Sequence, residues 1–300
     1  MNKALKDKIK GIIKNKVLFD EAMDLHTSFR IGGPAEAWVE PGDLKSLVGL
    51  VKFARKEGIP LMIIGAGSNI LVRDEGIKGI VVNLSSDYFK RIDVDQRRLR
   101  AWSGLEIVSL LRVMVDKELA GLEFMADIPG TVGGAVMMNA GRKDRAIGDL
   151  ISSVEVIDGK GEVFKIGKRE IKFGYRFSGL DDYIILSADF NLNKRPSGLI
   201  SRQINKYAFT KRNSQELKLP SAGSVFKNPT AVSSASARLI ELSGLKGKRL
   251  GNARVSFKHA NFIVNLDKAR ARDVIGLIEL IKSAVKRDHG VNLELEIKII

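Results

Sequence analysis

The stretch LMIIGAGSNILV, residues 61–72, constrains the fold more than any other part of the sequence. An apolar run enters a glycine loop, Gly65 to Asn69, and apolar residues follow, which predicts a strand, a tight loop and a second strand or helix start. The segment before it, Leu44 to Gly58, has apolar residues at helical spacing and ends on glycine. Residues 76–84, GIKGIVVNL, predict another strand. The N-terminal region is therefore expected to be α/β.

The rest of the chain mixes both kinds of element. We expect strands and then a helix around residues 106–124, and a hairpin turning at Asp158-Gly159. A strand follows at 181–193, and a boundary falls near residues 194–198, where proline and glycine interrupt the pattern. Beyond it the patterns predict helices at 198–215, 235–245 and 271–290, and strands at 259–266 and 293–300. The whole chain is therefore expected to be α+β.

Charge is unevenly distributed along the chain. The net charge is +15, and residues 201–300 contribute +11 of it, from 19 Lys and Arg against 8 Asp and Glu. An anionic ligand is therefore expected at the last third, either nucleic acid or a phosphorylated small molecule. Only 6% of residues are aromatic, and no basic run is interleaved with aromatic residues. That composition disfavours single-stranded nucleic acid.

Cysteine is absent, which excludes disulfides, thiolate catalysis and iron–sulfur ligation. The three histidines share no close spacing, so we expect no metal site. Neither a leader nor an apolar run of transmembrane length is found, and a cytoplasmic location away from membranes is expected. The amphipathic N-terminus is expected to form a surface helix.

Two glycine-rich loops are candidates for phosphate binding. One is Gly65 to Asn69, and the other begins at Gly130-Thr131 and continues through Gly133-Gly134 to Gly141. Glycine allows backbone N–H groups to approach a phosphate, and a helix starting at Gly133 would add its positive end. The alternative is a tight turn beside close packing. Neither loop fits the Rossmann or P-loop pattern. Together they suggest one extended ligand, such as a dinucleotide.

A third stretch, SAGSVFKNP from Ser221 to Pro229, is expected to be a loop entering a helix. Its second serine, Ser224, follows a glycine and precedes an apolar pair. A serine in this position is either a helix N-cap or a residue with a chemical role, and both functions can coexist. Ser221 is assigned the structural role.

Six motifs occur in an order that resembles the UDP-N-acetylenolpyruvoylglucosamine reductases. They are HTSFRIGGPA, GAGSNILV, DIPGTVGGAVMMNAG, FGYR, PSAGSVFKNP and KHANFIVN, and the resemblance extends over residues 20 to 300. It implies an α+β flavoprotein of three domains with a vanillyl-alcohol-oxidase-like (PCMH-type) FAD-binding module. The expected ranges are 1–85 and 86–195 for the two FAD-binding subdomains and 196–300 for an α+β substrate domain. The C-terminal strand is expected to return to the first of them.

The resemblance also implies the activity. FAD would be the cofactor and NADPH the co-substrate, and UDP-N-acetylglucosamine enolpyruvate would be reduced to UDP-N-acetylmuramate for peptidoglycan synthesis. The arrangement resembles the shorter subtype, and a cytoplasmic monomer binding a UDP-sugar but no nucleic acid is expected. One alternative is a flavin-dependent oxidase or dehydrogenase of the same fold with another substrate. A basic, non-enzymatic nucleic-acid binder is the other.

The chemistry indicates what the catalytic residues must do. Hydride addition to the β-carbon of an enol ether conjugated to a carboxylate collects negative charge on the α-carbon and the carboxylate. By resemblance, Arg176 would bind the carboxylate, Ser224 would protonate the α-carbon, and Glu296 would stabilise or protonate the intermediate. Arginine suits the first role because its fork matches a carboxylate. Glu294, two residues from Glu296, remains the alternative acid.

The other expected contacts follow from the same motifs. The residues expected to bind the cofactor are Gly65, Gly67, Ser68, Asn69, Ile70, Pro129, Gly130, Thr131, Gly133, Gly134, Asn139, Gly141 and Arg212. Those expected to bind the substrate are Tyr175, Lys227, Asn228 and Gln215. The sequence departs from the family at Phe257, where glutamate is usual, and at residues 142–146. These departures leave substrate affinity and the rim near the flavin open. His259 is expected to be structural.

Overall fold

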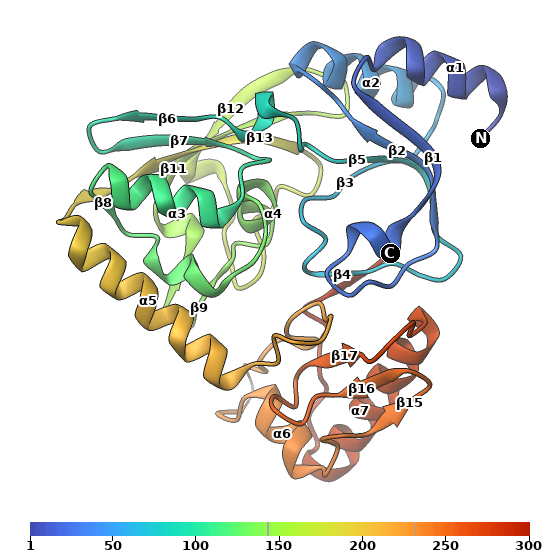
Figure 1. The fold of residues 1–300 in the computed structure, drawn as a ribbon, viewed down its shortest axis with the longest axis vertical. Coiled ribbons are helices and arrows are strands. Elements are labelled where there is room, and N and C mark those ends of the chain that lie inside the picture. Colours follow the sequence, from blue (N-terminus) through green and yellow to red (C-terminus); the bar gives the residue numbers. More distant parts are fainter. Residues whose placement is uncertain (143, 231) are drawn as a thin grey trace. The chain divides into compact units, whose positions relative to one another are not determined.

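The structure is a computed structural model that describes residues 1–142, 144–230 and 232–300. The chain divides into two compact units, each discontinuous in sequence. The first comprises residues 1–20, 36–66 and 78–210, and the second comprises residues 21–35, 67–77 and 211–300. Figure 1 shows helices and strands in both units, as expected for an α+β protein.

The first unit contains a four-stranded sheet in the order β1-β2-β5-β3. Its strands are β1 (Lys16–Ala22), β2 (Pro34–Glu40), β5 (Ile77–Val82) and β3 (Leu61–Ile63), of which β3 and β5 are parallel. Two helices, α1 (Lys3–Ile12) and α2 (Leu44–Lys56), bury their apolar side chains in the core beside this sheet. Asp43 begins α2 by accepting the N–H of Ser46 over 2.7 Å, a capping interaction. The helix therefore starts where the sequence pattern predicts.

A second sheet of the first unit is antiparallel, in the order β12-β11-β13-β7-β6. Its strands are β12 (Val163–Gly167), β11 (Ile151–Ile157), β13 (Ile184–Asn191), β7 (Arg98–Trp102) and β6 (Ile92–Asp95). Helices α3 (Ile107–Asp116) and α4 (Val132–Met137) contribute to the core beside this sheet, and α5 (Ser197–Ser214) packs Ile204 and Tyr207 against it. The first unit also contains two separate two-stranded sheets. One pairs β9 (Gly141–Arg142) with β10 (Arg145–Ala146), and the other pairs β8 (Leu119–Ala120) with β14 (Asn193–Lys194).

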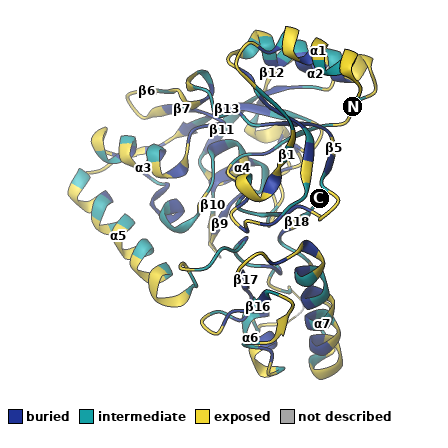
Figure 2. Cartoon of the chain, turned by 45° about the vertical axis from the view of Figure 1, so that its right-hand side comes forward, coloured by how far each residue is buried: buried dark blue, intermediate teal, exposed yellow. Residues whose placement is uncertain are grey.

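The second unit is built around a small antiparallel sheet in the order β15-β16-β17. The strands are β15 (Arg249–Leu250), β16 (Ala253–Val255) and β17 (Ile263–Asn265), with the helices α6 (Ser236–Leu242) and α7 (Ala271–His289) beside them. Figure 2 shows α7 buried along one side and exposed along the other. Near the C-terminus, β18 (Lys298–Ile299) pairs in parallel with β4 (Ile70–Leu71). The last residues of the chain therefore lie beside the end of the first glycine loop.

Most predicted elements are confirmed, including the hairpin at 158–159 and the long helix closed by Gly290, whose φ is 71°. Three details were wrong. The helix expected over 106–124 ends at Asp116, because Glu118 and Gly121 have positive φ and the chain turns back. The strand expected over 293–300 is regular only at β18. The stretch 221–229 enters no helix, because α6 begins at Ser236.

Candidate active site

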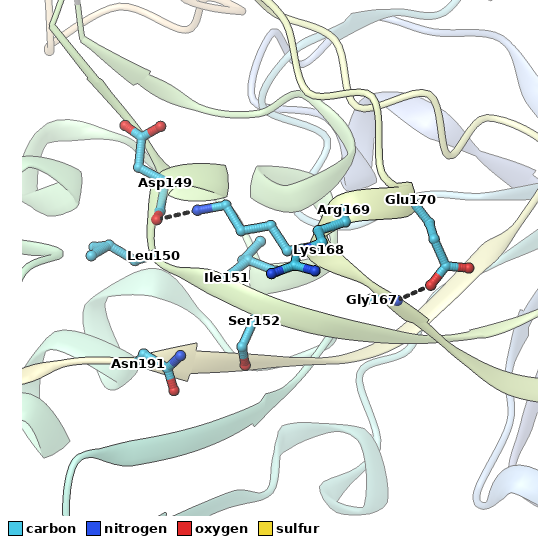
Figure 3. A pocket seen from close by; sticks show the side chains of 9 residues that line it. All are labelled: Asp149, Leu150, Ile151, Ser152, Gly167, Lys168, Arg169, Glu170 and Asn191. Carbon is cyan, nitrogen blue, oxygen red and sulfur yellow. Dashed lines mark hydrogen bonds between the residues drawn. The ribbon is translucent and has the colours of Figure 1, made fainter.

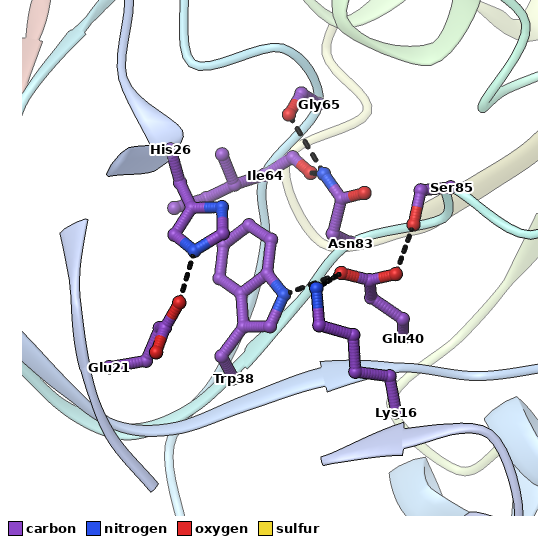
Figure 4. A network of polar contacts seen from close by, with 9 residues as sticks. All are labelled: Lys16, Glu21, His26, Trp38, Glu40, Ile64, Gly65, Asn83 and Ser85. Atoms are coloured by element: carbon purple, nitrogen blue, oxygen red, sulfur yellow. Dashed lines mark hydrogen bonds and ion pairs between the residues drawn. The ribbon is translucent and has the colours of Figure 1, made fainter. Parts of the chain in front are cut away.

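The first glycine loop connects β3 to β4 and is held by a residue the sequence reasoning missed, Asn83. Its side-chain nitrogen donates to the carbonyl oxygens of Ile64 (2.8 Å) and Gly65 (2.9 Å), as Figure 4 shows. Within the described residues, the N–H groups of Gly65 and Ala66 form no hydrogen bond. The loop therefore retains donors that an anion can use.

The end of this loop is fixed within the second unit. Gly67 has a φ of 61°, and a Cβ there would lie 2.2 Å from the carbonyl oxygen of His26. The N–H of Ser28 donates to the carbonyl oxygen of Gly67 over 3.1 Å. Gly67 is therefore required by backbone geometry and close packing, irrespective of any ligand. Ser68 and Ile70 follow it, and both are half-buried.

The second glycine loop, from Pro129, leads into α4, which begins at Val132 with Thr131 as its N-cap. The N–H of Val132 donates to the carbonyl oxygen of Leu105 (2.8 Å), and that of Gly133 to Ser103 (2.9 Å). The expectation that the start of this helix turns a free N–H group to a phosphate was therefore wrong for Gly133, because the carbonyl oxygen of Ser103 already accepts that group.

The two loops meet at Gly65 and Thr131. A Cβ on Gly65 would lie 2.5 Å from the Thr131 hydroxyl oxygen, and one on Gly133 would lie 2.7 Å from the Ser103 Cβ. Both glycines are therefore explained by packing. Gly134 differs, because it is exposed and the nearest atom to an added Cβ would be 3.6 Å away. Nothing in the described protein requires glycine there, so Gly134 leaves room for a ligand.

These features fit a flavin dinucleotide. The diphosphate of such a cofactor needs hydrogen-bond donors, which Gly65 and Ala66 present, and its close approach needs backbone without a side chain, which Gly134 offers. Gly130 contributes a positive φ of 140° at the turn into the second loop. The Ser103 hydroxyl, against Gly133, is buried and has no hydrogen-bond partner among the described residues.

Arg176 lies in a two-residue turn of the first unit. Gly174 and Phe177 exchange backbone hydrogen bonds of 2.8 and 3.2 Å across it, and Arg176 has a φ of 56°. A positive φ at a non-glycine residue is strained and is found disproportionately at functional sites. The guanidinium donates to the carbonyl oxygen of Gly141 (3.0 Å) and lies 5.2 Å from the centre of the Tyr175 ring. Its orientation is thus fixed by the loop that ends at Gly141.

Asn139 joins this turn to α4. Its side-chain nitrogen donates to the carbonyl oxygen of Gly174 (2.8 Å), and its oxygen accepts the N–H of Gly148 (3.0 Å). The side chain is buried and both of its polar atoms are bound within the protein. A cofactor contact from Asn139 would therefore come from its backbone.

The segment that follows Gly141 is basic. Arg142 forms an ion pair with Asp127, and its guanidinium lies 4.6 Å from the centre of the Tyr207 ring. These contacts hold Arg142 on the first unit. Lys143, which belongs to the same departure from the family pattern, lies outside the described residues.

Ser224 and Glu296 lie on adjacent segments of the second unit. The N–H of Glu296 donates to the carbonyl oxygen of Val225 over 2.8 Å, and Phe226 forms a backbone bridge with Leu295. Asn69 donates from its side chain to the carbonyl oxygen of Glu296 over 3.1 Å. The structure therefore brings together two predicted catalytic residues that are far apart in sequence. The amide of Asn69, expected to contact the cofactor, is bound to Glu296.

Glu294 has a different environment from Glu296. Its side chain is 78% exposed and pairs with the ammonium group of Lys227 at 3.5 Å. The carbonyl oxygen of Glu294 accepts the N–H of Lys227 over 2.9 Å. Glu296 is half-buried, and this favours it as the acid near Ser224.

Lys227 and Asn228 are held against the start of α6. The hydroxyl of Ser236 donates to the carbonyl oxygen of Lys227, and the N–H of Ser236 donates to the Asn228 side-chain oxygen over 3.1 Å. The N-capping role considered for Ser224 is therefore wrong, because the N-cap of α6 is Ala235, and the side chain that accepts the N–H of Ser236 is that of Asn228. The Lys227 ammonium group, one third exposed, remains on the surface.

Arg212 and Gln215 lie at the end of α5 and just beyond it. Arg212 is exposed, and its carbonyl oxygen accepts a hydrogen bond from the ammonium group of Lys258. The N–H of Gln215 continues the helical pattern by donating to Lys211 over 2.9 Å. The hydrogen bonds given above for both residues involve only their backbone atoms, so their expected ligand contacts remain predictions.

Phe257 is 64% exposed, and its ring lies so close to Gly247 that a Cβ there would be 2.3 Å from it. The Arg254 guanidinium carbon lies 4.8 Å from the centre of the same ring. An aromatic–cation pair therefore stands where the family usually has glutamate.

Burial lowers the pKa of His259, and the nearby charge of Lys246 lowers it further. Its ring packs edge-on against Phe262, with centres 4.7 Å apart. A neutral, half-buried imidazole fits the structural role expected of it.

Figure 4 shows a separate polar network around Glu40 in the first unit. Trp38, Lys16 and Ser85 all donate to its carboxylate at 2.8 to 2.9 Å. Burial raises the pKa of Glu40, but these hydrogen bonds lower it overall. The carboxylate is fully engaged, so the network is structural.

One hollow of about 510 Å³ in the first unit contains none of the predicted residues. Figure 3 shows the hydrogen bond from the Lys168 ammonium group to the carbonyl oxygen of Asp149 at its edge. Its lining residues are Asp149, Leu150, Ile151, Ser152, Gly167, Lys168, Arg169, Glu170 and Asn191. In the described ranges, no cluster of metal-ligating side chains is found, and no helix is long and apolar enough to cross a membrane.

Two family models match the chain. Residues 35–167 match an FAD binding domain, and residues 215–300 match the C-terminal domain of UDP-N-acetylenolpyruvoylglucosamine reductase. The first range includes both glycine loops, and the second includes Ser224 and Glu296.

Similar proteins agree over nearly the whole length. UDP-N-acetylenolpyruvoylglucosamine reductase of Syntrophus aciditrophicus is 40% identical over 99% of this chain and 96% of its own. That of Moorella thermoacetica is 41% identical over 99% and 97%. The crystal structure of the Thermus caldophilus reductase is similar with a TM-score of 0.80 and 33% identity over 95% of this chain and 98% of that one. An alkyldihydroxyacetonephosphate synthase, at 15% identity and a TM-score of 0.51, shares the fold over 65% of this chain and 41% of its own.

Proposed function

The chain belongs to the UDP-N-acetylenolpyruvoylglucosamine reductase family, and we propose how its own residues carry out the FAD-dependent reduction of UDP-N-acetylenolpyruvoylglucosamine. When bound, FAD carries hydride from NADPH to the β-carbon of the enolpyruvyl group. The two glycine loops, through the N–H groups of Gly65 and Ala66 and the open backbone at Gly134, are proposed to hold it. We retain the three ranges 1–85, 86–195 and 196–300 as the proposed domain division.

Arg176 is proposed to bind the substrate carboxylate. Its guanidinium is already oriented by the carbonyl oxygen of Gly141, so little reorganisation is needed when charge develops. Tyr175, nearly half exposed in the same turn, is proposed to contact the substrate beside it.

Ser224 is proposed to donate the proton to the α-carbon. In the described part of the chain, no group hydrogen-bonds its side-chain oxygen, so the hydroxyl can turn toward a substrate. Glu296 is proposed to stabilise or protonate the same intermediate. The observation that carries this assignment is the backbone hydrogen bond between Glu296 and Val225, which places the two residues on adjacent segments.

The nucleotide end of the substrate is proposed to contact Lys227, Asn228 and Gln215. The excess positive charge of residues 201–300 supports an anionic ligand for this unit. We further propose that the enzyme acts as a cytoplasmic monomer without nucleic acid. Sedimentation of the purified protein with and without RNA would test the monomeric state and the lack of RNA binding.

Replacing Ser224 by alanine tests the proposal. We expect product formation to slow by about 10²–10⁴-fold, the range of general acid catalysis. Bleaching of the bound flavin by NADPH alone should stay within about two-fold of wild type, since that step needs no proton donor to the substrate carbon. Ser221→Ala, in the same stretch, is the matched control and should leave both rates nearly unchanged. Equal loss of both rates in Ser224→Ala would remove Ser224 as the donor.

One observation favours a second candidate, a flavoenzyme of this fold acting on a different substrate. Phe257 stands where the resemblance implies glutamate, and its contact with Arg254 makes the surface there aromatic and cationic. If that surface changes the substrate, NADPH will bleach the flavin but UDP-N-acetylenolpyruvoylglucosamine will not restore its absorbance. Rapid restoration by that substrate would exclude the second candidate.

A further inference from the structure

We propose that Asn261 is a positioning residue that sets the placement of Ser224 and its adjacent segment. The proposal rests on the proposed role of Ser224 as proton donor. Asn261 belongs to the motif KHANFIVN, yet the chemistry assigned above gives it no task.

Asn261 binds the two residues after Ser224 through three hydrogen bonds. Its side-chain oxygen accepts the N–H of Phe226 (2.9 Å), and its side-chain nitrogen donates to the carbonyl oxygen of Phe226 (2.7 Å). Its own carbonyl oxygen accepts the N–H of Val225 over 2.8 Å. The side chain thus pairs with Phe226 as a neighbouring strand would.

Only an amide side chain of this length serves both partners. Phe226 is 1% exposed and Asn261 is 4% exposed, so water cannot replace either bond. Aspartate would accept the N–H but would place a second acceptor against the Phe226 carbonyl oxygen. An aliphatic residue would satisfy neither group. Asn261 is therefore matched to the backbone that it holds.

Asn261 and its neighbour hold the Ser224 segment on one side, and Glu296 binds the same segment on the other. Ser224 forms a backbone bridge with Phe262, the residue next to Asn261. The carbonyl oxygen of Val225 meanwhile accepts the N–H of Glu296. Loss of the Asn261 side chain releases one side of the segment and lets Ser224 shift relative to Glu296. A displacement of 1 Å at a reacting group can cost about 10²-fold in rate.

The same motif provides a matched control in Asn265. It is also 4% exposed and makes three hydrogen bonds, donating to the carbonyl oxygens of Phe29 (3.0 Å) and Arg30 (3.2 Å) and accepting the N–H of Ala269 (3.0 Å). None of these partners belongs to the Ser224 segment. A purely structural cost of losing a buried amide should therefore be similar at both positions.

The experiment compares Asn261→Asp with Asn265→Asp in the FAD-loaded enzyme. We expect similar losses in Tm for both variants. Only Asn261→Asp should lower kcat for product formation, by about 10- to 10²-fold. KM and the rate of flavin bleaching by NADPH should change little. The solvent deuterium isotope effect on kcat should rise only in Asn261→Asp, because proton transfer becomes slower there.

The double variant Ser224→Ala/Asn261→Asp tests whether Asn261 acts through Ser224. Its kcat should equal that of Ser224→Ala, since a misplaced donor cannot matter once the donor is gone. An additional loss in the double variant, or equal kcat values for Asn261→Asp and Asn265→Asp, would overturn the proposal.

If Asn261→Asp does not fold, a milder variant, Asn261→Gln, can test the same proposal. Asn261→Gln keeps both polar groups but moves them by one methylene, so it should fold and lose part of kcat. Wild-type kcat in folded Asn261→Gln would contradict the proposal. If Ser224→Ala alone forms product at the wild-type rate, the proposed role of Ser224 fails and the role of Asn261 fails with it. If kcat is low in Ser224→Ala but wild-type in Asn261→Asp, only the proposed role of Asn261 fails.

Discussion

The N–H of Glu296 donates to the carbonyl oxygen of Val225 over 2.8 Å, and this bond joins the end of the chain to the segment of Ser224. Neighbouring contacts maintain the register, with Phe226 bridged to Leu295 and the N–H of Lys227 bound to Glu294. The proposed proton donor and the proposed acid therefore share a backbone ladder. Their relative placement depends on the short ladder and not on flexible loops.

The two glutamates near the C-terminus should respond differently to neutralisation. We expect Glu296→Gln to lower kcat by about 10²-fold or more, because it would remove the charge that is proposed to act beside the reacting carbon. Glu294→Gln breaks only an exposed ion pair with Lys227, a type of interaction worth about 0–1 kcal/mol. Its kcat should stay within about two-fold of wild type. Steady-state assays of both variants decide the assignment, which reverses if Glu294→Gln is the slower enzyme.

Alanine substitutions in the two glycine loops should distinguish a glycine that is needed for cofactor binding from one that is needed for packing. Gly134→Ala places its Cβ 3.6 Å from the nearest described atom, so Tm of the apoprotein should change little. Its Cβ would occupy the space proposed for FAD, so the Kd for FAD should rise by about 10-fold or more, which corresponds to about 1.4 kcal/mol. Flavin fluorescence titration measures this Kd.

Gly65→Ala is the contrasting variant. Its Cβ would lie 2.5 Å from the Thr131 hydroxyl oxygen, so we expect a lower Tm even without FAD. A Gly134→Ala apoprotein that melts as early as Gly65→Ala would show that Gly134 serves packing rather than the cofactor.

Arg176→Lys tests whether the fork of the guanidinium is needed. Lysine keeps the charge but offers no bidentate geometry for a carboxylate, so we expect kcat/KM to fall by about 10²-fold. Arg169→Lys, on an exposed residue of the same unit, should leave kcat/KM unchanged. Assays at several substrate concentrations separate binding from turnover. An Arg176→Lys enzyme with wild-type kcat/KM would exclude a bidentate contact.

Local patterns in the sequence predicted the elements that depend on local signals. The long helix closed by Gly290 and the hairpin at Asp158 are examples, since capping and turn chemistry act over a few residues. The sequence motifs also led to Ser224, Arg176 and Glu296 through their resemblance to a family. The hydrogen bonds that hold the backbones of these residues in place are known only from the structure.

The polar contacts of buried amides could not be predicted from patterns. Asn83 is half-buried and Asn261 is buried, and each lies in an apolar stretch. An amide there has to find partners, but the sequence does not say which. Asn69 and Asn139 were expected at the cofactor, and the structure shows their side chains bound to Glu296 and Gly174 instead. Long-range pairing decides such contacts, and single-sequence periodicity carries no information about it.

Asp189 lies on β13, in the antiparallel sheet of the first unit. Its carboxylate accepts hydrogen bonds from Arg100 (2.7 Å), Ser153 (2.7 Å) and Lys165 (3.1 Å) on three other strands of the same sheet. Burial raises the pKa of Asp189, but these bonds outweigh it and lower the pKa from 3.8 to about 2. A carboxyl group whose pKa is lower in the folded than in the unfolded protein stabilises the fold at pH values above its unfolded pKa. The contribution, about 2 kcal/mol, is present above pH 4 and is lost as the pH falls toward 2.

Asp189→Asn should therefore lower the free energy of unfolding by about 2 kcal/mol at pH 7, and the difference from wild type should shrink between pH 4 and pH 2. Urea unfolding at a series of pH values measures it. Asp93→Asn is the control, because Asp93 also lies opposite Arg100 but is exposed and makes no hydrogen bond to it in the described residues. That variant should change the free energy by less than about 0.5 kcal/mol at pH 7. A pH-independent difference between Asp189→Asn and wild type would mean that the lost packing, rather than the charge of Asp189, stabilises the sheet.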